Sequence, residues 1–154
     1  MKRLFSIGIV LGLVMLLCGM PGNAGASERY TCKYCGSTAS SIYSLTSGYC
    51  QRHPDGAGKG RHVPYEGDSN QKKYYCEYCG SSASSVYSLT AGNCQRHPNG
   101  TGKGHHKPYE GSEKSRYTCK YCGSSASSIY SLTVGNCQRH PNGAGKGHHI
   151  PSLH

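Results

Sequence analysis

Three cysteines and two histidines recur at fixed intervals in three copies along this chain, and their spacing is typical of a metal site. In the first copy, Cys32 and Cys35 are separated by two residues, and Cys50 follows after fourteen more. His53 stands three residues after Cys50, and His62 stands nine residues after His53. Two cysteines in one tight turn can hold a single ion, and a second pair of ligands completes a tetrahedron around it.

The internal spacing is the same in all three copies, so each copy offers the same candidate ligands. Three cysteines and one histidine fit a closed tetrahedral zinc site, which predicts one Zn²⁺ per repeat and three in total. The sequence leaves the fourth ligand open. The nearer histidine would form a short chelate with the third cysteine, whereas the constant length of the Gly-rich loop favours the farther one. The candidate ligands are Cys32, Cys35, Cys50, His53 and His62; Cys76, Cys79, Cys94, His97 and His106; and Cys119, Cys122, Cys137, His140 and His149.

Composition indicates why a metal is needed. The chain has no Trp and a single Phe, and the large aliphatic residues of the first copy are Ile42 and Leu45. A unit of about 40 residues with so little to bury cannot offset the conformational entropy of its own chain. Disulfides are the usual alternative at this size, but three cysteines per copy would leave one thiol unpaired in each. Zinc is therefore favoured, and disulfides stay the alternative.

The elements that must position these ligands are short. Residues 30–36 predict a strand and a turn, with Gly36 suited to a backbone that curls around a metal. Residues 40–47 favour a short helix with a serine cap, although Ile, Tyr and Thr also suit a strand. Gly48 is expected to end the helix in a left-handed conformation. The predicted fold class is small metal-stabilised modules: three tandem zinc-finger-like units of short β-hairpin, short helix and Gly-rich loop, with little hydrophobic core.

The repeats divide the chain into modules and polar connectors. Successive copies are offset by 44 and then 43 residues, and the one-residue difference falls in the linker. Constant units with variable connectors are typical of tandem modules on flexible links. The predicted segments are a signal peptide at 1–26, repeat 1 at 30–67, a linker at 68–73, repeat 2 at 74–111, a linker at 112–116 and repeat 3 at 117–154.

The first 26 residues have the features of a secretory signal peptide. Lys2 and Arg3 are followed by an apolar run over residues 4–20, and small residues at 24–26 fit a cleavage site. We therefore expect an exported protein, either periplasmic or secreted. A retained membrane anchor and a lipid on Cys18 are less favoured alternatives.

The front half of each copy resembles the two-Cys/two-His zinc finger of nucleic-acid-binding proteins. The resemblance rests on an aromatic residue before the C-x2-C-G turn and a leucine after it, while an alanine replaces the core aromatic. The back half departs from that family, because its two histidines would fall on Gly48 and Arg52. The whole pattern looks more like bacterial exported tandem Cys/His repeat proteins. The matching positions are Tyr30, Cys32, Cys35, Gly36, Ala39 and Leu45; Tyr74, Cys76, Cys79, Gly80, Ala83 and Leu89; and Tyr117, Cys119, Cys122, Gly123, Ala126 and Leu132.

The resemblance implies base-reading positions at Ser41, Ser44 and Ser47, and serine discriminates bases weakly. No sequence-specific DNA reading is therefore expected. The chain nevertheless carries 17 Lys and Arg against 7 Asp and Glu. Basic loops could bind an anionic polymer, such as nucleic acid or an envelope polymer, and the alternative is a merely soluble basic surface. The basic residues in question are Lys59, Arg61, Lys103 and Lys146, with Arg52, Arg96 and Arg139 close by.

Catalysis is not expected from these sites. A catalytic zinc keeps one open position, whereas thiolates dominate each copy here and fill a closed shell. The sequence therefore predicts an exported, non-enzymatic zinc-binding repeat protein with a structural or interaction role. The alternatives are a zinc storage or scavenging protein, and a disulfide-linked envelope protein without metal.

Overall fold

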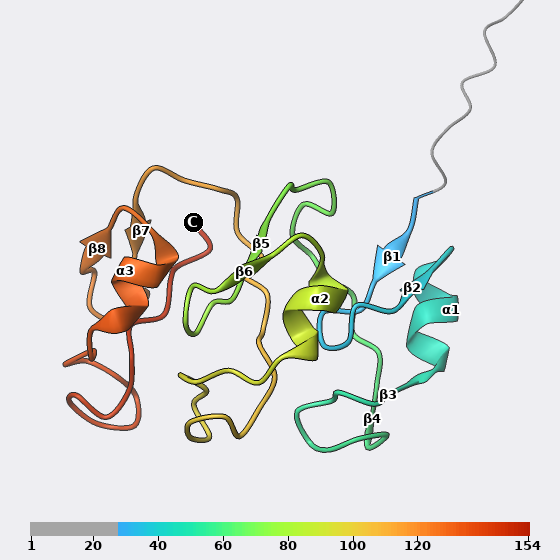
Figure 1. Ribbon diagram of the computed structural model, residues 1–154, viewed down its shortest axis with the longest axis horizontal. Helices are drawn as coiled ribbons and strands as arrows, with labels where there is room; N and C mark the ends of the chain where they lie inside the picture. The colour runs from blue at the N-terminus through green and yellow to red at the C-terminus, as the bar shows by residue number, and fades with distance from the viewer. Residues whose placement is uncertain (1–27) are drawn as a thin grey trace, which may run out of the picture.

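The computed structural model describes residues 28–154, which form three small units side by side along the long axis of the molecule (Figure 1). Each unit contains an antiparallel two-stranded hairpin followed by one short helix. This confirms the predicted fold class of three small repeated modules. Residues 1–27 lie outside the described part, and the predicted signal peptide falls there.

The elements of the three units correspond one to one. At six residues each, none of the helices within residues 28–154 is long enough to cross a bilayer. The first unit contains β1 (Tyr30–Thr31), β2 (Thr38–Ala39), α1 (Ile42–Ser47), β3 (Tyr49–Cys50) and β4 (Gly60–Arg61); the second contains β5 (Tyr74–Tyr75), β6 (Ser82–Ala83) and α2 (Val86–Ala91); the third contains β7 (Tyr117–Thr118), β8 (Ser125–Ala126) and α3 (Ile129–Val134).

The turn between β1 and β2 carries the first pair of cysteines. Tyr30 pairs with Ala39 across the two strands. The Gly36 N–H donates to the Cys32 carbonyl at 2.8 Å, and Gly36 has a φ of 72°. That left-handed conformation is one that glycine adopts without the Cβ clash of other residues. The predicted strand and turn, and the need for glycine at the bend, are confirmed.

The segment that fitted either a helix or a strand is a helix. Ser41 caps α1, because its Oγ accepts a hydrogen bond from Ser44 N at 3.1 Å. Ser85 and Ser128 cap α2 and α3 in the same way. One detail of the prediction is wrong: Gly48 ends α1 with a φ of −87°, which is extended and not left-handed. The reason for a glycine there lies in the histidine beside it, described below.

A second hairpin, which the sequence did not indicate, closes the Gly-rich loop of the first unit. Cys50 in β3 faces Gly60 in β4. Inside the loop, Gly58 N donates to the Cys50 carbonyl and Gly56 N to the His53 carbonyl, both at 3.0 Å. Backbone hydrogen bonds therefore fix the loop length without any help from a metal. The equivalent places in the other two units carry single bridges, Asn93–His105 and Asn136–His148.

The segment after each loop returns to the first strand of its own unit. In the first unit, Lys33 N donates to the Val63 carbonyl at 2.9 Å, and Tyr65 N donates to the Thr31 carbonyl at 2.7 Å. This return places His62, which comes just before it, next to the turn that holds the first two cysteines. The equivalent bonds are Glu77–Lys107 and Tyr109–Tyr75 in the second unit, and Lys120–Ile150 and Ser152–Thr118 in the third.

Each unit has only a small interior. The buried cluster of the first unit consists of Cys32, Cys35, Leu45 and Cys50. The clusters of the second and third units add tyrosines and one valine or isoleucine each. Sulfur therefore makes up much of each interior, in agreement with the predicted lack of a large apolar core.

Neighbouring units pack against each other, a point that the sequence left open. The Tyr65 hydroxyl donates to the Tyr109 carbonyl at 3.1 Å, and its ring packs edge-on against Tyr74 with centroids 5.9 Å apart. Lys33 also forms an ion pair with Glu110 at 3.4 Å. The three units thus form one continuous array.

Candidate metal centre

Each unit gathers three cysteine sulfurs and one histidine nitrogen into a compact group. In every group the four donor atoms lie within 4.8 Å of one another. The histidine in each group is the farther of the two candidates, the one that follows the Gly-rich loop. The groups are Cys32, Cys35, Cys50 and His62; Cys76, Cys79, Cys94 and His106; and Cys119, Cys122, Cys137 and His149.

The distances within a group fit a tetrahedral ion. The Sγ atoms of Cys32 and Cys50 are 3.9 Å apart, and Cys35 Sγ lies 3.4 Å from His62 Nδ1. The same pairs measure 3.8 and 3.4 Å in the second unit, and 3.9 and 3.3 Å in the third. Zinc bonds of ordinary length in a tetrahedron require about 3.8 Å between sulfurs and about 3.5 Å between sulfur and nitrogen. The donor set therefore matches zinc in both type and spacing.

The four donors of a unit come from three separate segments that the fold brings together. Cys32 and Cys35 stand on the turn between β1 and β2, and Cys50 ends β3. His62 directly follows β4, and its N–H donates to the Gly48 carbonyl at 3.1 Å. An ion held by all four would tie the hairpin, the helix end and the returning segment to one point.

The electrostatics of the groups favour a bound cation. Burial, helped by negative charge on Cys32, raises the pKa of Cys50 to about 12, so neighbouring thiols resist ionising together. Hydrogen bonding to Cys76 and Cys79 raises the pKa of His106 to about 10, so this imidazole is held protonated between the sulfurs. A bound divalent cation would balance the negative charge of the thiolates. Its binding would release the protons that the thiols and the imidazole carry.

Polar hydrogens around the sulfurs support the thiolate form. Tyr34 N donates to Cys32 Sγ at 3.4 Å. In the third unit, the hydrogen bond with the Ser124 hydroxyl is the main cause that lowers the pKa of Cys122 to about 6. Such contacts orient metal ligands and tune their basicity. These serines were not predicted from the sequence, although each stands two residues after the second cysteine of its C-x2-C turn.

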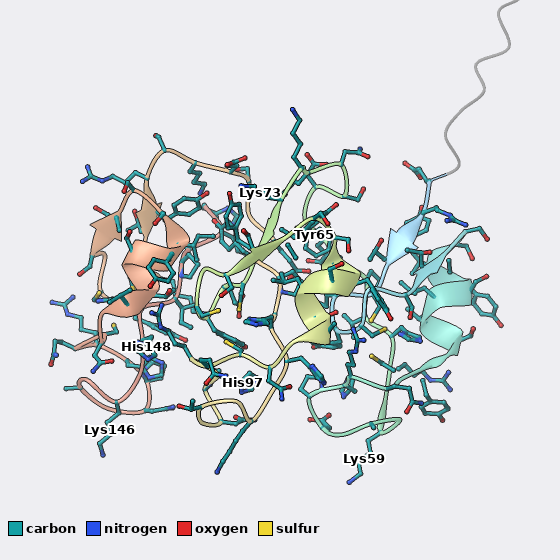
Figure 2. The ribbon with its side chains drawn as sticks, viewed as in Figure 1. Lys59, Tyr65, Lys73, His97, Lys146 and His148 are labelled. Carbon is teal, nitrogen blue, oxygen red and sulfur yellow. The ribbon has the colours of Figure 1, made fainter. Side chains whose placement is uncertain are left out.

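The nearer histidines lie outside the three groups and support the loops. His53 Nδ1 accepts a hydrogen bond from Asp55 N at 3.3 Å. Its ring packs edge-on against Tyr34 with centroids 5.1 Å apart, and a Cβ on Gly60 would collide with the ring. His97, labelled in Figure 2, and His140 make the same contacts with Tyr78 and Tyr121. A packing role therefore accounts for these three histidines.

The glycine at the end of each helix makes room for the histidine of the metal group. A Cβ on Gly48 would lie 3.2 Å from His62 Cδ2, which is tighter than ordinary van der Waals contact. Gly92 and Gly135 stand in the same relation to His106 and His149, at 3.3 Å in both units. Glycine at these positions therefore leaves the space that the neighbouring imidazole occupies.

The fold and the site together define a class of protein. The chain is a tandem array of three zinc-finger-like units, each with a Cys3His group that could hold one metal ion. The nine cysteines of residues 28–154 are free of disulfides. Comparison of the chain with models of protein families, with curated proteins and with solved structures gave no match in any of the three.

Proposed function

We propose that the protein binds three Zn²⁺ ions as structural elements and serves, without catalysis, as an interaction or spacing module. The observation that carries the proposal is the Cys3His geometry, repeated three times with sulfur and nitrogen distances that suit tetrahedral zinc. Soft thiolate donors select zinc over magnesium or calcium. Zinc at each site would supply much of the folding free energy that the small interiors lack.

A structural role suits these sites better than catalysis or storage. Four protein donors close a tetrahedral shell and leave no position for a substrate or a reactive water. Most of the cysteines are buried, which disfavours the ready exchange that a storage protein needs. Export, expected from residues 1–26, places the protein in the periplasm or outside the cell. There zinc would also protect the thiols from oxidation.

The test is native mass spectrometry of the mature protein made by exporting cells. Three zinc ions with nine alkylatable thiols after denaturation are the expected result. Removal of the metal by a chelator should abolish the far-ultraviolet signature of folded units, and added zinc should restore it. Zinc-free protein that stays folded, or protein whose thiols are joined in disulfides, would overturn the proposal.

A second role, binding of an anionic polymer, is supported by the loop lysines. Lys59 and Lys146 project from the same edge of the molecule, the one formed by the Gly-rich loops (Figure 2). Neither is among the ion pairs of residues 28–154. By contrast, Arg61 is held by the Ser47 carbonyl at 2.6 Å and stacks on Tyr49, so it is a poorer candidate.

Salt dependence tests this second role. Affinity for a polyanion should fall as salt rises, because each neutralised phosphate or carboxylate releases a counterion. Replacing Lys59, Lys103 and Lys146 together by glutamine should flatten the salt dependence, whereas replacing Lys73, on the opposite edge (Figure 2), should change it less. Equal binding by both variants would exclude the loop edge as the surface.

A further inference from the structure

The contact between the first and second units is built from two complementary surfaces. The Arg52 guanidinium lies over the Tyr87 ring at 5.0 Å and donates to Thr90 Oγ1 at 3.2 Å. It also donates to the carbonyl of Cys35 in its own unit, at 3.4 Å. Gly36 lies so close to the backbone of Tyr87 that a Cβ there would collide with it. One surface is therefore a glycine and an arginine, and the other is a helix face.

The contact between the second and third units repeats this arrangement. Arg96 lies over the Tyr130 ring at 5.1 Å and donates to Thr133 Oγ1 at 3.1 Å. Gly80 meets the backbone of Tyr130 as Gly36 meets that of Tyr87. We name the first surface the socket, which is Gly36 and Arg52, Gly80 and Arg96, or Gly123 and Arg139. The second is the helix face, which is Ile42, Tyr43 and Thr46; Val86, Tyr87 and Thr90; or Ile129, Tyr130 and Thr133.

One helix face and one socket stay uncovered within residues 28–154. Ile42 of the first helix face is 50% exposed, whereas its counterparts Val86 and Ile129 are 4% and 2% exposed. At the other side of the array, a Cβ on Gly123 would meet nothing within 4 Å, and Arg139 is exposed. The array therefore presents an uncovered helix face at the first unit and an uncovered socket at the third unit.

We propose that the helix face of the first unit docks into the socket of the third unit of a second copy of this chain. The side chains required are already present, because residues 42–46 and 129–133 have the same sequence, Ile-Tyr-Ser-Leu-Thr. The socket of the third unit likewise repeats the glycine and arginine of the other two. The joint would be head to tail, so it leaves one free helix face and one free socket and can extend into a chain of copies. This inference goes beyond the proposed zinc-binding role.

The joint between copies would lack the tyrosine contacts that both internal joints have. Tyr65 and Tyr109 each donate a hydroxyl hydrogen bond to the next unit, at 3.1 and 2.7 Å, and pack on its first tyrosine. The third unit has Ser152 at this position. The association is therefore weaker than the packing inside one chain, and its extent depends on protein concentration.

The test is sedimentation of the mature, zinc-loaded protein over a range of concentrations, combined with a mixing experiment. Ile42→Asp removes the helix face and Arg139→Glu removes the socket, and each variant alone should lose association. Because each variant keeps the surface that the other lacks, an equal mixture should form dimers and nothing longer. Association through a symmetric surface would not show this pattern.

Two matched controls keep the outcome interpretable. Val134→Asp places the same charge at a helix residue that is 52% exposed but belongs to no helix face, and Lys146→Glu matches the charge change of Arg139→Glu. Both should associate like the unchanged protein, and all variants should hold the same number of zinc ions. A zinc-loaded protein that is monomeric at every concentration, or a mixture that fails to form dimers, would overturn the proposal.

Discussion

The two histidines of each repeat both keep a constant spacing from the cysteines, but they have different roles in the structure. His62 belongs to the metal group and has its Nδ1 3.4 Å from Cys35 Sγ, whereas His53 Nδ1 accepts a hydrogen bond from a backbone N–H in its own loop. Both keep a constant distance from the cysteines along the chain, one because of the metal group and the other because of the loop it supports. Constant spacing shows that a position is constrained, and only the contacts show by what.

The largest expected difference between the two histidines is in metal content. His62→Ala removes one of four donors, so the first unit should lose its zinc and the protein should retain two ions. His53→Ala leaves the donors in place, so three ions should remain. Native mass spectrometry of the two variants measures this directly. Three ions in His62→Ala and two in His53→Ala would exchange the roles assigned to the histidines.

A smaller effect is expected on stability, and it belongs to the loop histidine. His53→Ala removes an edge-on aromatic contact and a hydrogen bond, which together are worth about 1–3 kcal/mol. Gly60→Ala should cost a similar amount, because its Cβ would displace the same ring. Unfolding by increasing chelator, at one fixed total zinc concentration for all variants, should show both losses of stability. Ala57→Ser, an exposed change in the same loop, serves as the control and should leave stability unchanged.

The smallest effect is expected at Gly48. Its φ is accessible to alanine, so Gly48→Ala should not strain the backbone, and only the new contact with His62 disturbs the site. We expect zinc affinity in the first unit to fall by about tenfold or less. Competition with a coloured zinc chelator measures the change. A loss as large as that of His62→Ala would mean that the glycine is needed for its conformation after all.

The sequence predicted the features that depend on neighbours along the chain. The C-x2-C turn, the glycine at its bend and the serine cap of the helix all follow from local chemistry, and each occurs in the structure. Leu45 is buried at the position that the zinc-finger resemblance assigns to its core leucine. Ala39 stands in place of the core aromatic and lies across the hairpin from Tyr30.

The features that the sequence could not settle depend on residues far apart. Whether His53 or His62 joins the cysteines is decided by the hairpin of β3 and β4 and by the return of the chain to β1, and neither leaves a local signal. The packing of units was hidden for the same reason. Nothing in the sequence distinguishes Arg52 from a solvated surface arginine, because its partner Thr90 belongs to helix α2 of the next unit.

The exposure of Cys122 determines the order in which the three units are expected to be oxidised. Cys35 and Cys79 are buried beneath the unit that follows them, while Cys122 is partly open among the described residues. Because peroxide must reach a sulfur before it can oxidise the thiolate to sulfenic acid, the more open Cys122 is the readier target. Oxidative damage should therefore begin at the third unit and advance toward the first, with each lost unit uncovering the next vulnerable sulfur.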